Sequence, residues 1–335
     1  MGNPTFRDLI AENKRDSALL IAGFCLFVVV VAMLLGLAVM AYTDPKSFER
    51  LDWREAISFG VGGGVVALIL SYFAYFGGDN MILAVNGAQP IAHDDDPELF
   101  NVVEEMAIAA GVPMPRVYLM HDPALNAFAT GRDPQHAVIA ITTGLRSKLT
   151  RDELQGVIAH EMSHVRNYDI RLMLLMAVLV GTVVMLCDLF WQILRWSPSG
   201  GSTSRRRDSK DSGAGIFILV ILVLAIILAI IAPILAHLIQ LAVSRQREYL
   251  ADASAVELTR YPQGLVNALR KIDEDPHDLR SANRGTAHLF IANPVKHFQS
   301  LADTAFASHP PIQDRIRRLE ALEGIRNQGP GPQQS

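Results

Sequence analysis

The chain has 335 residues, of which 50% are hydrophobic and only 19% are charged. A soluble domain of this size usually carries about 25% charged residues, so the composition excludes an ordinary cytosolic globule, and the many apolar residues exclude a disordered chain. The formal net charge of −4 argues against a nucleic-acid partner, because nucleic-acid binders normally present a strongly basic face. Cys25 and Cys187 both lie in apolar runs and can build neither a disulfide framework nor a cysteine zinc site.

The first two long apolar runs cover residues 17–42 and 56–76. A bilayer core is crossed by about 20 apolar helical residues, so each run predicts a transmembrane helix, and residues 17–76 are expected to hold two spans. The apolar region of a signal peptide has only about 7–15 residues, which argues against a cleaved leader. The second run contains three consecutive glycines at positions 62–64, where a neighbouring helix can approach closely.

Two further apolar runs predict a helical membrane hairpin at residues 172–243, with a basic loop at 195–215. Asp188 interrupts the first of these runs and His237 lies in the second. Both side chains are costly in hydrocarbon unless they face protein or water. The alternative is a buried helical hairpin in the core of a large soluble protein. The fold class expected from these runs is a mainly α integral membrane protein with four transmembrane or membrane-associated helices.

The number of spans sets which segments share one side of the bilayer. Four spans would place both chain ends and residues 77–171 on one side and the loop 195–215 on the other. The basic residues of that loop favour the cytoplasm under the positive-inside rule, which conflicts with this parity. Residues 1–16 contain no strongly apolar leader, so we expect them to form a cytoplasmic stub. The water-exposed domain would then also face the cytoplasm.

Residues 77–171 and 244–323 are expected to form the two halves of a water-exposed α+β domain, and residues 324–335 a disordered tail. Asp96 is a good N-cap and Pro97 a good first residue for a helix that ends at Gly111.

Later in the first half, strands are expected at 116–120 and 136–141, and residues 125–131 between them form either a loop or an edge strand. Thr150 and Glu153 have capping-box spacing. They open a helix that is expected to continue past residue 169.

That helix carries the motif His160-Glu161-x-x-His164. Residues four positions apart lie on one face of a helix, so the two imidazoles can converge on one tetrahedral zinc ion. Glu161 projects from an adjacent angle, where its carboxylate can take a proton from a zinc-bound water that attacks a peptide carbonyl. The alternative is a chance match on a solvated helix, a risk that any short motif carries.

A zinc ion in a hydrolytic site usually has three protein ligands and one open position. Glu248 and Asp252 follow the fourth apolar run and are also four residues apart. Glu248 is a candidate ligand, and Asp252 a candidate acceptor for the N–H group of a ligating histidine. Two spans would separate the two motifs and put them on the same side of the membrane. The alternative is an exposed charged helix cap after a membrane span.

These motifs together resemble those of the HtpX-type membrane zinc metalloproteases, which are relatives of the CAAX prenyl endopeptidases. The resemblance is carried by four widely spaced segments, residues 126–131, 160–169, 244–252 and 308–312. It implies a zincin-like protease domain, one Zn²⁺ per chain, and Glu248 as the third ligand. It also implies a bacterial inner membrane, a site that faces the cytoplasm, and stress-linked quality control in which unfolded or membrane polypeptides are the substrates.

Two further residues in these motifs are candidates for substrate and transition-state contacts. His309, which precedes two prolines, is either part of a rigid surface turn or a group that stabilises the oxyanion. Asn126 is either an ordinary turn residue or a partner for extended substrate backbone in strand addition.

Two other functions compete with a membrane-anchored endopeptidase. In an intramembrane zinc protease the motif would lie within a span, but here charged residues flank it on both sides. A non-catalytic scaffold with a structural zinc would fill all four metal positions with protein ligands, whereas only three candidates are present.

Overall fold

The computed structural model describes residues 6–43, 53–181, 245–280, 286–293 and 310–327. The chain divides into two compact units. The sheet unit combines Met1–Ser17, Ala74–Val178 and Leu238–Ser335, and the apolar-helix unit combines Ala18–Phe73 and Leu179–His237. The two halves of the domain expected from the sequence therefore belong to one unit, together with the N-terminal stub.

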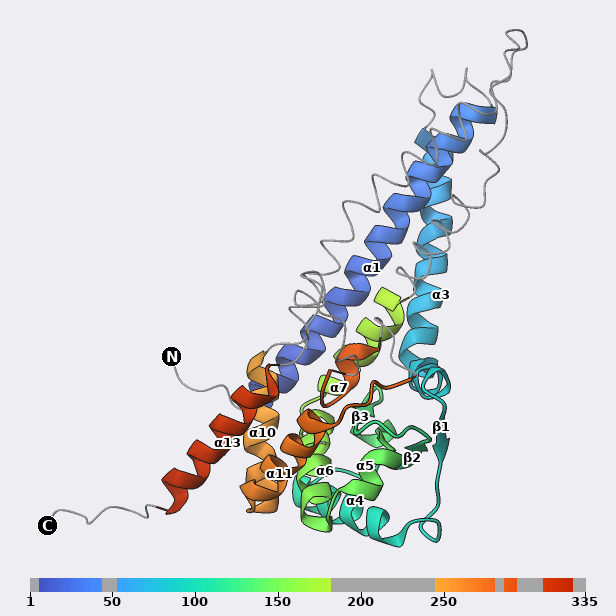
Figure 1. The fold of residues 1–335 in the computed structure, drawn as a ribbon. Coiled ribbons are helices and arrows are strands. Elements are labelled where there is room, and N and C mark those ends of the chain that lie inside the picture. Colours follow the sequence, from blue (N-terminus) through green and yellow to red (C-terminus); the bar gives the residue numbers. More distant parts are fainter. Residues whose placement is uncertain (1–5, 44–52, 182–244, 281–285, 294–309, 328–335) are drawn as a thin grey trace, which may run out of the picture. The chain divides into compact units, whose positions relative to one another are not determined.

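Two long helices carry the first two apolar runs (Figure 1). Helix α1 is Phe6–Thr43 and helix α3 is Trp53–Val85. Within them, Ala11–Met33 and Ile57–Val85 are long and apolar enough to cross a membrane, which confirms two candidate membrane helices. Because α1 begins at Phe6, the described part of the expected stub is helical.

The helices of the apolar-helix unit approach closely at the glycines noted in the sequence. A Cβ atom on Gly63 would lie 2.4 Å from the Cβ atom of Ala32 and 3.1 Å from the carbonyl oxygen of Val28, so this separation requires glycine. Other apolar side chains point outward, and those of Leu68 and Phe73 are 62% and 65% exposed. Such exposed apolar surface is typical of a face that meets lipid.

Only the start of the third apolar run lies within the described residues. There, helix α7, Asp169–Leu175, continues into a π-helical turn, Met176–Val180. Leu174 is buried, and its side chain packs on Gly78 of α3 within the sheet unit. The rest of the predicted hairpin, residues 182–243, falls outside the described residues.

The sheet has four strands in the order β1-β2-β4-β3. They are β1 Ala88–Pro90, β2 Arg116–Met120, β3 Ala127–Thr130 and β4 Val138–Thr142. The central pair β2–β4 is parallel and the two outer pairs are antiparallel. β3 confirms the edge-strand alternative for residues 125–131. β4 begins two residues later than predicted because Pro134–His136 form a 3-10 turn capped by Asp133.

Helix α4, Pro97–Ala110, has the predicted Asp96 cap and ends at Gly111, which has a left-handed φ of 68°. Helix α5, Thr143–Lys148, precedes helix α6, Arg151–Arg166, which has the predicted capping box of Thr150 and Glu153.

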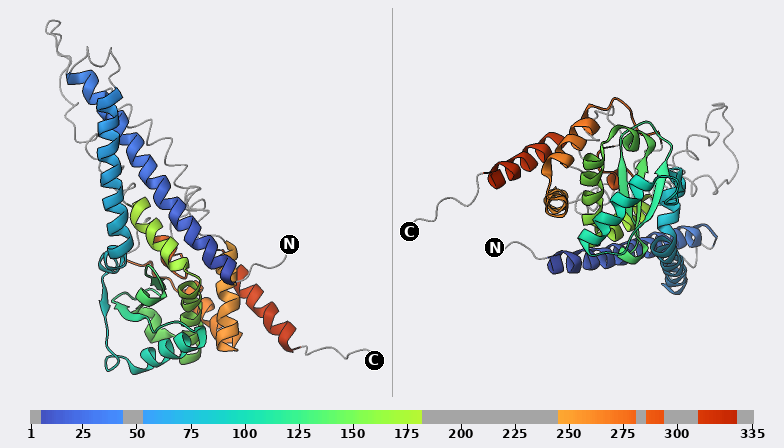
Figure 2. Two further views of the ribbon diagram at one scale, coloured as in Figure 1. Left: turned by 180° about the vertical axis from the view of Figure 1, so that it is seen from behind. Right: turned by 90° about the horizontal axis from the view of Figure 1, so that it is seen from below.

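The second half of the domain contributes α10 Arg245–Thr259, α11 Pro262–Glu274 and α13 Ile312–Asn327. Helix α6 packs against β3, α4, α10 and α11 (Figure 2). It approaches α11 closely, since a Cβ atom on Gly156 would lie 2.6 Å from the backbone nitrogen of Leu265. The central position of α6 places its motif in the core of the sheet unit.

Two expected boundaries are wrong. Helix α6 does not continue past residue 169: it ends at Arg166, Tyr168 adopts a left-handed φ of 63°, and α7 begins at Asp169. This break turns the Asp169 carboxylate back to His164, with which it forms a hydrogen bond. At the chain end, α13 continues to Asn327, so the first part of the expected tail 324–335 is helical.

Candidate metal site

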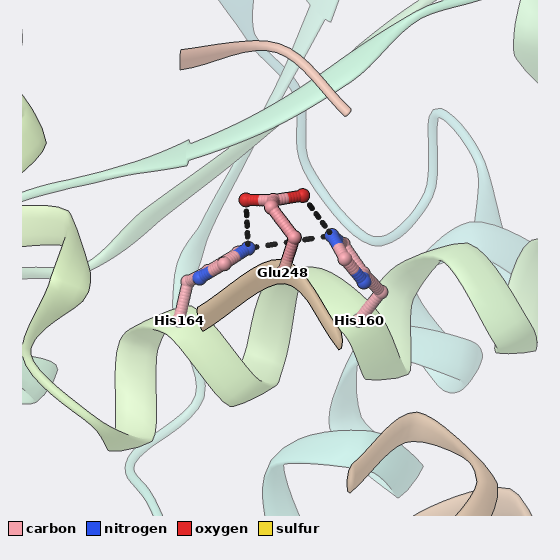
Figure 3. A group of neighbouring side chains, drawn as sticks. All are labelled: His160, His164 and Glu248. Atoms are coloured by element: carbon pink, nitrogen blue, oxygen red, sulfur yellow. Dashed lines mark hydrogen bonds and ion pairs between the residues drawn. The ribbon is translucent and has the colours of Figure 1, made fainter. Parts of the chain in front are cut away.

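The two histidines of the motif lie one turn apart on α6 and face each other (Figure 3). The Nε2 atoms of His160 and His164 are 3.3 Å apart, and the side chains are 1% and 4% exposed. Glu248 approaches both from α10, with Oε1 3.6 Å from Nε2 of His164 and Oε2 3.7 Å from Nε2 of His160. The structure therefore brings Glu248 to the two histidines, the nearer of which precedes it by 84 residues along the chain.

These separations suit a tetrahedral zinc site. Ligand atoms held about 2.0–2.1 Å from a tetrahedral zinc ion lie about 3.3–3.4 Å from one another. One donor atom from each of His160, His164 and Glu248 lies within 4.8 Å of the others, and all three residues are buried. Two imidazole nitrogens and a carboxylate are also the donor types that zinc binds in hydrolytic enzymes. The residues present therefore fit a zinc ion.

Each histidine is held by a carboxylate on its other nitrogen. Nδ1 of His160 lies 3.0 Å from Oδ1 of Asp252, and Nδ1 of His164 lies 2.9 Å from Oδ2 of Asp169. An Nδ1–H donated to a carboxylate leaves Nε2 without a proton and free to ligate a metal. Asp252 thus lies where the sequence predicted it. Asp169 was not recognised in this role, although it follows His164 within the same motif.

Arg315 on α13 completes the contacts behind His160. Its guanidinium is fully buried and donates two hydrogen bonds to Asp252, of 2.9 Å from Nε and 2.7 Å from Nη2. Nη1 donates a third, of 2.7 Å, to the carbonyl oxygen of Ile291. Sequence reasoning missed this residue. Its one signal is its position shortly after the motif at 308–312, but three further arginines follow it on the same helix.

Burial and charge shift the pKa values of these groups. Burial raises the pKa of Glu161, and the nearby histidines offset only part of that effect. Burial opposes protonation of His164, but the hydrogen bond to Asp169 and the charge of Glu248 outweigh it and raise the pKa to about 9. Burial also opposes ionisation of Asp252, yet Arg315 and the hydrogen bond from His160 lower its pKa to about 2.

Glu161 lies beside the three ligand candidates and is 1% exposed. The backbone N–H group of Ala129, on β3, donates a hydrogen bond to its carboxylate. β3 is the outermost strand of the sheet on the side of α6. The carboxylate of Glu161 is therefore held against the edge strand of the sheet.

Asn126 has both polar ends of its side chain engaged by this chain. Its Nδ2 donates to the carbonyl oxygen of Ala292 at 3.2 Å, and its Oδ1 accepts from the N–H group of Ala127 at 3.1 Å. Ile291 also donates its N–H group to the carbonyl oxygen of Ala127, and Phe128 pairs with Phe290. The described contacts of the Asn126 side chain are therefore with the protein's own backbone, and the predicted contact with substrate backbone stays a prediction.

The other transition-state candidate, His309, lies outside the described residues, which resume at 310. Its proposed contact with the site stays a prediction.

Comparison with protein families matches residues 93–323 to Peptidase family M48. Two proteins named "Protease HtpX homolog", from Levilactobacillus brevis and Dictyoglomus thermophilum, are 45% and 42% identical to this chain over 316 and 318 residues. The first match covers 94% of this chain and 99% of the relative, and the second covers 95% of each. Among solved structures, the crystal structure of S. mikatae Ste24p matches with a TM-score of 0.43 and 20% identity, covering 86% of this chain but only 61% of Ste24p.

Proposed function

The chain belongs to peptidase family M48 and is a metalloendopeptidase, and from this premise we propose that it is a membrane-anchored zinc endopeptidase that cleaves misfolded or membrane polypeptides. The observation that carries the proposal is the buried group of His160, His164 and Glu248, whose donor atoms all lie within 4.8 Å of one another. The proposed ion is one Zn²⁺ per chain, because two imidazoles and one carboxylate are a donor set that hydrolytic zinc sites use.

A bound Zn²⁺ would polarise the peptide carbonyl and lower the pKa of water in the site. Glu161 then accepts the proton of the attacking water and returns it to the nitrogen of the leaving amine. The raised pKa of Glu161 suits both steps, because a group that takes up and then gives back a proton works best when its pKa lies near the working pH. Asp169 and Asp252 hold the two imidazoles in the orientation that the ligands need.

The substrate backbone is proposed to pair with the outer edge of β3 beyond the N–H group of Ala129, which is already donated to Glu161, as in strand addition. Strand addition uses backbone hydrogen bonds, so it accepts many sequences, which suits unfolded polypeptides. Residues 290–292 occupy the start of this edge. Because Phe290 is completely buried, these residues belong to the fold rather than to a movable lid, and Asn126 acts by fixing them. His309 remains the candidate for stabilising the oxyanion.

The decisive experiment compares Glu161→Gln with the wild-type protein. The variant should retain stoichiometric zinc and the wild-type unfolding midpoint but lose at least about 100-fold in cleavage of an unfolded membrane protein, since general base catalysis contributes about 10²–10⁴-fold. Glu257→Gln, an exposed position on α10, is the matched control and should cleave normally. Wild-type cleavage by Glu161→Gln, or a wild-type protein that binds no zinc, would refute the proposal.

The proposed setting is a bacterial inner membrane, crossed four times, with the site facing the cytoplasm and a role in quality control under stress. Two helices long enough to span a bilayer support the membrane location. Single cysteines at Asp94, whose side chain is fully exposed, and at Gln333 test the topology in a background without Cys25 and Cys187. Both should resist an impermeant thiol reagent in intact spheroplasts and react after lysis. Labelling of both before lysis reverses the orientation, and labelling of one alone means an odd number of spans.

A further inference from the structure

Asn13, near the start of α1, lies beside the metal site although it precedes the motif by almost half the chain. Its side chain is buried, and Nδ2 donates to Oδ1 of Asp169 at 2.7 Å and to the carbonyl oxygen of Asn167 at 2.9 Å. A buried amide is costly without such partners. Asn13 belongs to the same sheet unit as these residues, so the contact lies within one compact body.

The Asp169 carboxylate is the link between Asn13 and the ligand candidate His164. One of its oxygens, Oδ2, meets Nδ1 of His164 at 2.9 Å, and the other, Oδ1, accepts from Asn13. Asp169 is itself 4% exposed, so water cannot readily replace the amide. The two hydrogen bonds fix the rotation of the carboxylate, and the carboxylate in turn fixes the imidazole plane.

The residues next to Asn13, which together with it form the segment 13–17, also contact the break between α6 and α7. The ammonium group of Lys14 lies 4.5 Å from the ring centre of Tyr168, the residue with the left-handed φ that ends α6. Such a cation–π contact stabilises by about 0.5–1 kcal/mol when exposed. On the other flank, Asp16 accepts a hydrogen bond of 3.2 Å from Arg247, which directly precedes Glu248. The segment 13–17 thus contacts the residues that directly follow α6 and the start of α10, and these two helices carry the ligand candidates.

We infer that Asn13 is a positioning residue of the metal site, which holds Asp169 and through it orients His164 toward the ion. The inference rests on the proposed zinc site and adds a residue from outside every motif that defines it. Asn13 also lies near the start of α1, the helix that contains the candidate membrane span Ala11–Met33. The orientation of one ligand candidate is therefore tied to the helix that is proposed to anchor the protein.

A double-mutant cycle on the full-length protein in detergent micelles tests this role, with Zn²⁺ affinity measured by competition with a chelator. Asn13→Ala should weaken Zn²⁺ binding by about 3- to 10-fold, less than the roughly 10- to 100-fold expected when a direct partner of a ligand is removed. Asn13→Asp has the same shape but sets a second carboxylate against Asp169, so it should weaken binding at least as much as Asn13→Ala. In an Asp169→Ala background, Asn13→Ala should change the affinity by less than about twofold, because coupled residues are not additive.

Asn86→Ala is the matched control. Asn86 is also a buried asparagine whose amide donates to a backbone carbonyl, that of Ile82. It should lower the unfolding midpoint of the metal-free protein without changing the affinity for Zn²⁺. Equal losses from Asn13→Ala in both backgrounds would overturn the inference, as would wild-type affinity in Asn13→Asp. The variant His164→Ala keeps the two proposals distinguishable. Normal Zn²⁺ binding by His164→Ala would contradict the proposed metal site and with it the proposed function. Loss of Zn²⁺ binding by His164→Ala supports that site, so the Asn13 variants then test the role of Asn13 alone.

Discussion

In the candidate metal site, each of the two histidines contacts a carboxylate through Nδ1, but the two carboxylates have different partners. Behind His160, the carboxylate of Asp252 is paired with the buried guanidinium of Arg315. Behind His164, the carboxylate of Asp169 accepts its second hydrogen bond from the neutral amide of Asn13. The carboxylate that contacts His160 is thus paired with a full positive charge, whereas the carboxylate that contacts His164 is paired with an uncharged amide dipole.

This difference has an electrostatic consequence. Arg315 compensates the charge of Asp252 so well that the pKa of this buried acid falls to about 2. Asp169 instead draws a proton onto its own ligand candidate, because its hydrogen bond and the charge of Glu248 raise the pKa of His164 to about 9 against the opposing effect of burial. A divalent ion would displace that proton and take over its charge. The charge behind His160 is therefore compensated by Arg315 of the fold, whereas the charge around His164 would be compensated by a bound ion.

The largest expected effect comes from removing Arg315, the charged partner of Asp252 behind His160. Arg315→Met removes one partner of a buried ion pair, so it should lower the free energy of unfolding of the metal-free protein by about 3–5 kcal/mol. Denaturant unfolding of the full-length protein measures this loss. Arg317→Met on the same helix, whose side chain is 76% exposed, should stay within about 0.5 kcal/mol of the wild type. A loss below about 1 kcal/mol in Arg315→Met would mean that Asp252 does not need the guanidinium.

Arg315 also shows where sequence reasoning reaches its limit. Helix α13 carries Arg315, Arg317 and Arg318 within four residues, and no local rule tells which of them is buried. Its partners Asp252 and His160 are 63 and 155 positions away along the chain. The packing of α13 against α11 and α10 brings Arg315, and not its neighbours, to these partners.

Features fixed by near neighbours were predictable. The Asp96 cap of α4 and the capping box of α6 depend on residues three positions apart, and both were correctly placed. The pairing of His160 with His164 likewise follows from helical spacing. The end of α6 at Arg166 was missed because the break at Tyr168 is stabilised by Asp169 and by Lys14 from α1 rather than by glycine or proline.

The next prediction concerns how the stability of the metal-free protein depends on pH through His164. The pKa of His164 in the folded metal-free protein, about 9, lies above its ordinary value of 6.5. Its stabilising contribution is therefore fully present below pH 6.5 and is lost as the pH rises through about 9. We expect the metal-free protein to lose up to about 3 kcal/mol across this window. Denaturant unfolding at several pH values should show the loss, and His164→Asn should remove it. An unchanged slope in His164→Asn would assign the dependence to other groups.

A smaller effect on metal-free stability should distinguish the carboxylate of Asp252 from that of Asp169. Asp252→Ala and Asp169→Ala should each weaken Zn²⁺ binding by about 10- to 100-fold, because each removes the acceptor for a ligating histidine. Only Asp252→Ala also removes the carboxylate that accepts two hydrogen bonds from a buried guanidinium, leaving Glu248 at 3.9 Å as the remaining ion-pair partner that the structure describes. Asp252→Ala should therefore destabilise the metal-free protein more than Asp169→Ala. Zinc affinity and denaturant unfolding on the same samples test both statements. Equal losses of stability would show that the charge of Arg315 is satisfied without Asp252.

The smallest expected effect concerns the ion pair between Asp16 of the N-terminal segment and Arg247 of α10. Asp16 and Arg247 form an ion pair of 3.2 Å whose side chains are 28% and 12% exposed, and ion pairs that water reaches contribute about 0–1 kcal/mol. Asp16→Asn should therefore lower the free energy of unfolding by less than about 1 kcal/mol and leave the affinity for Zn²⁺ within about twofold of the wild type, although Arg247 adjoins Glu248. The same assays that measure Asn13→Ala provide the test. If Asp16→Asn weakened Zn²⁺ binding as much as Asn13→Ala, the segment 13–17 would act on the site as one rigid piece, and the hydrogen bond from Asn13 to Asp169 would have no special role.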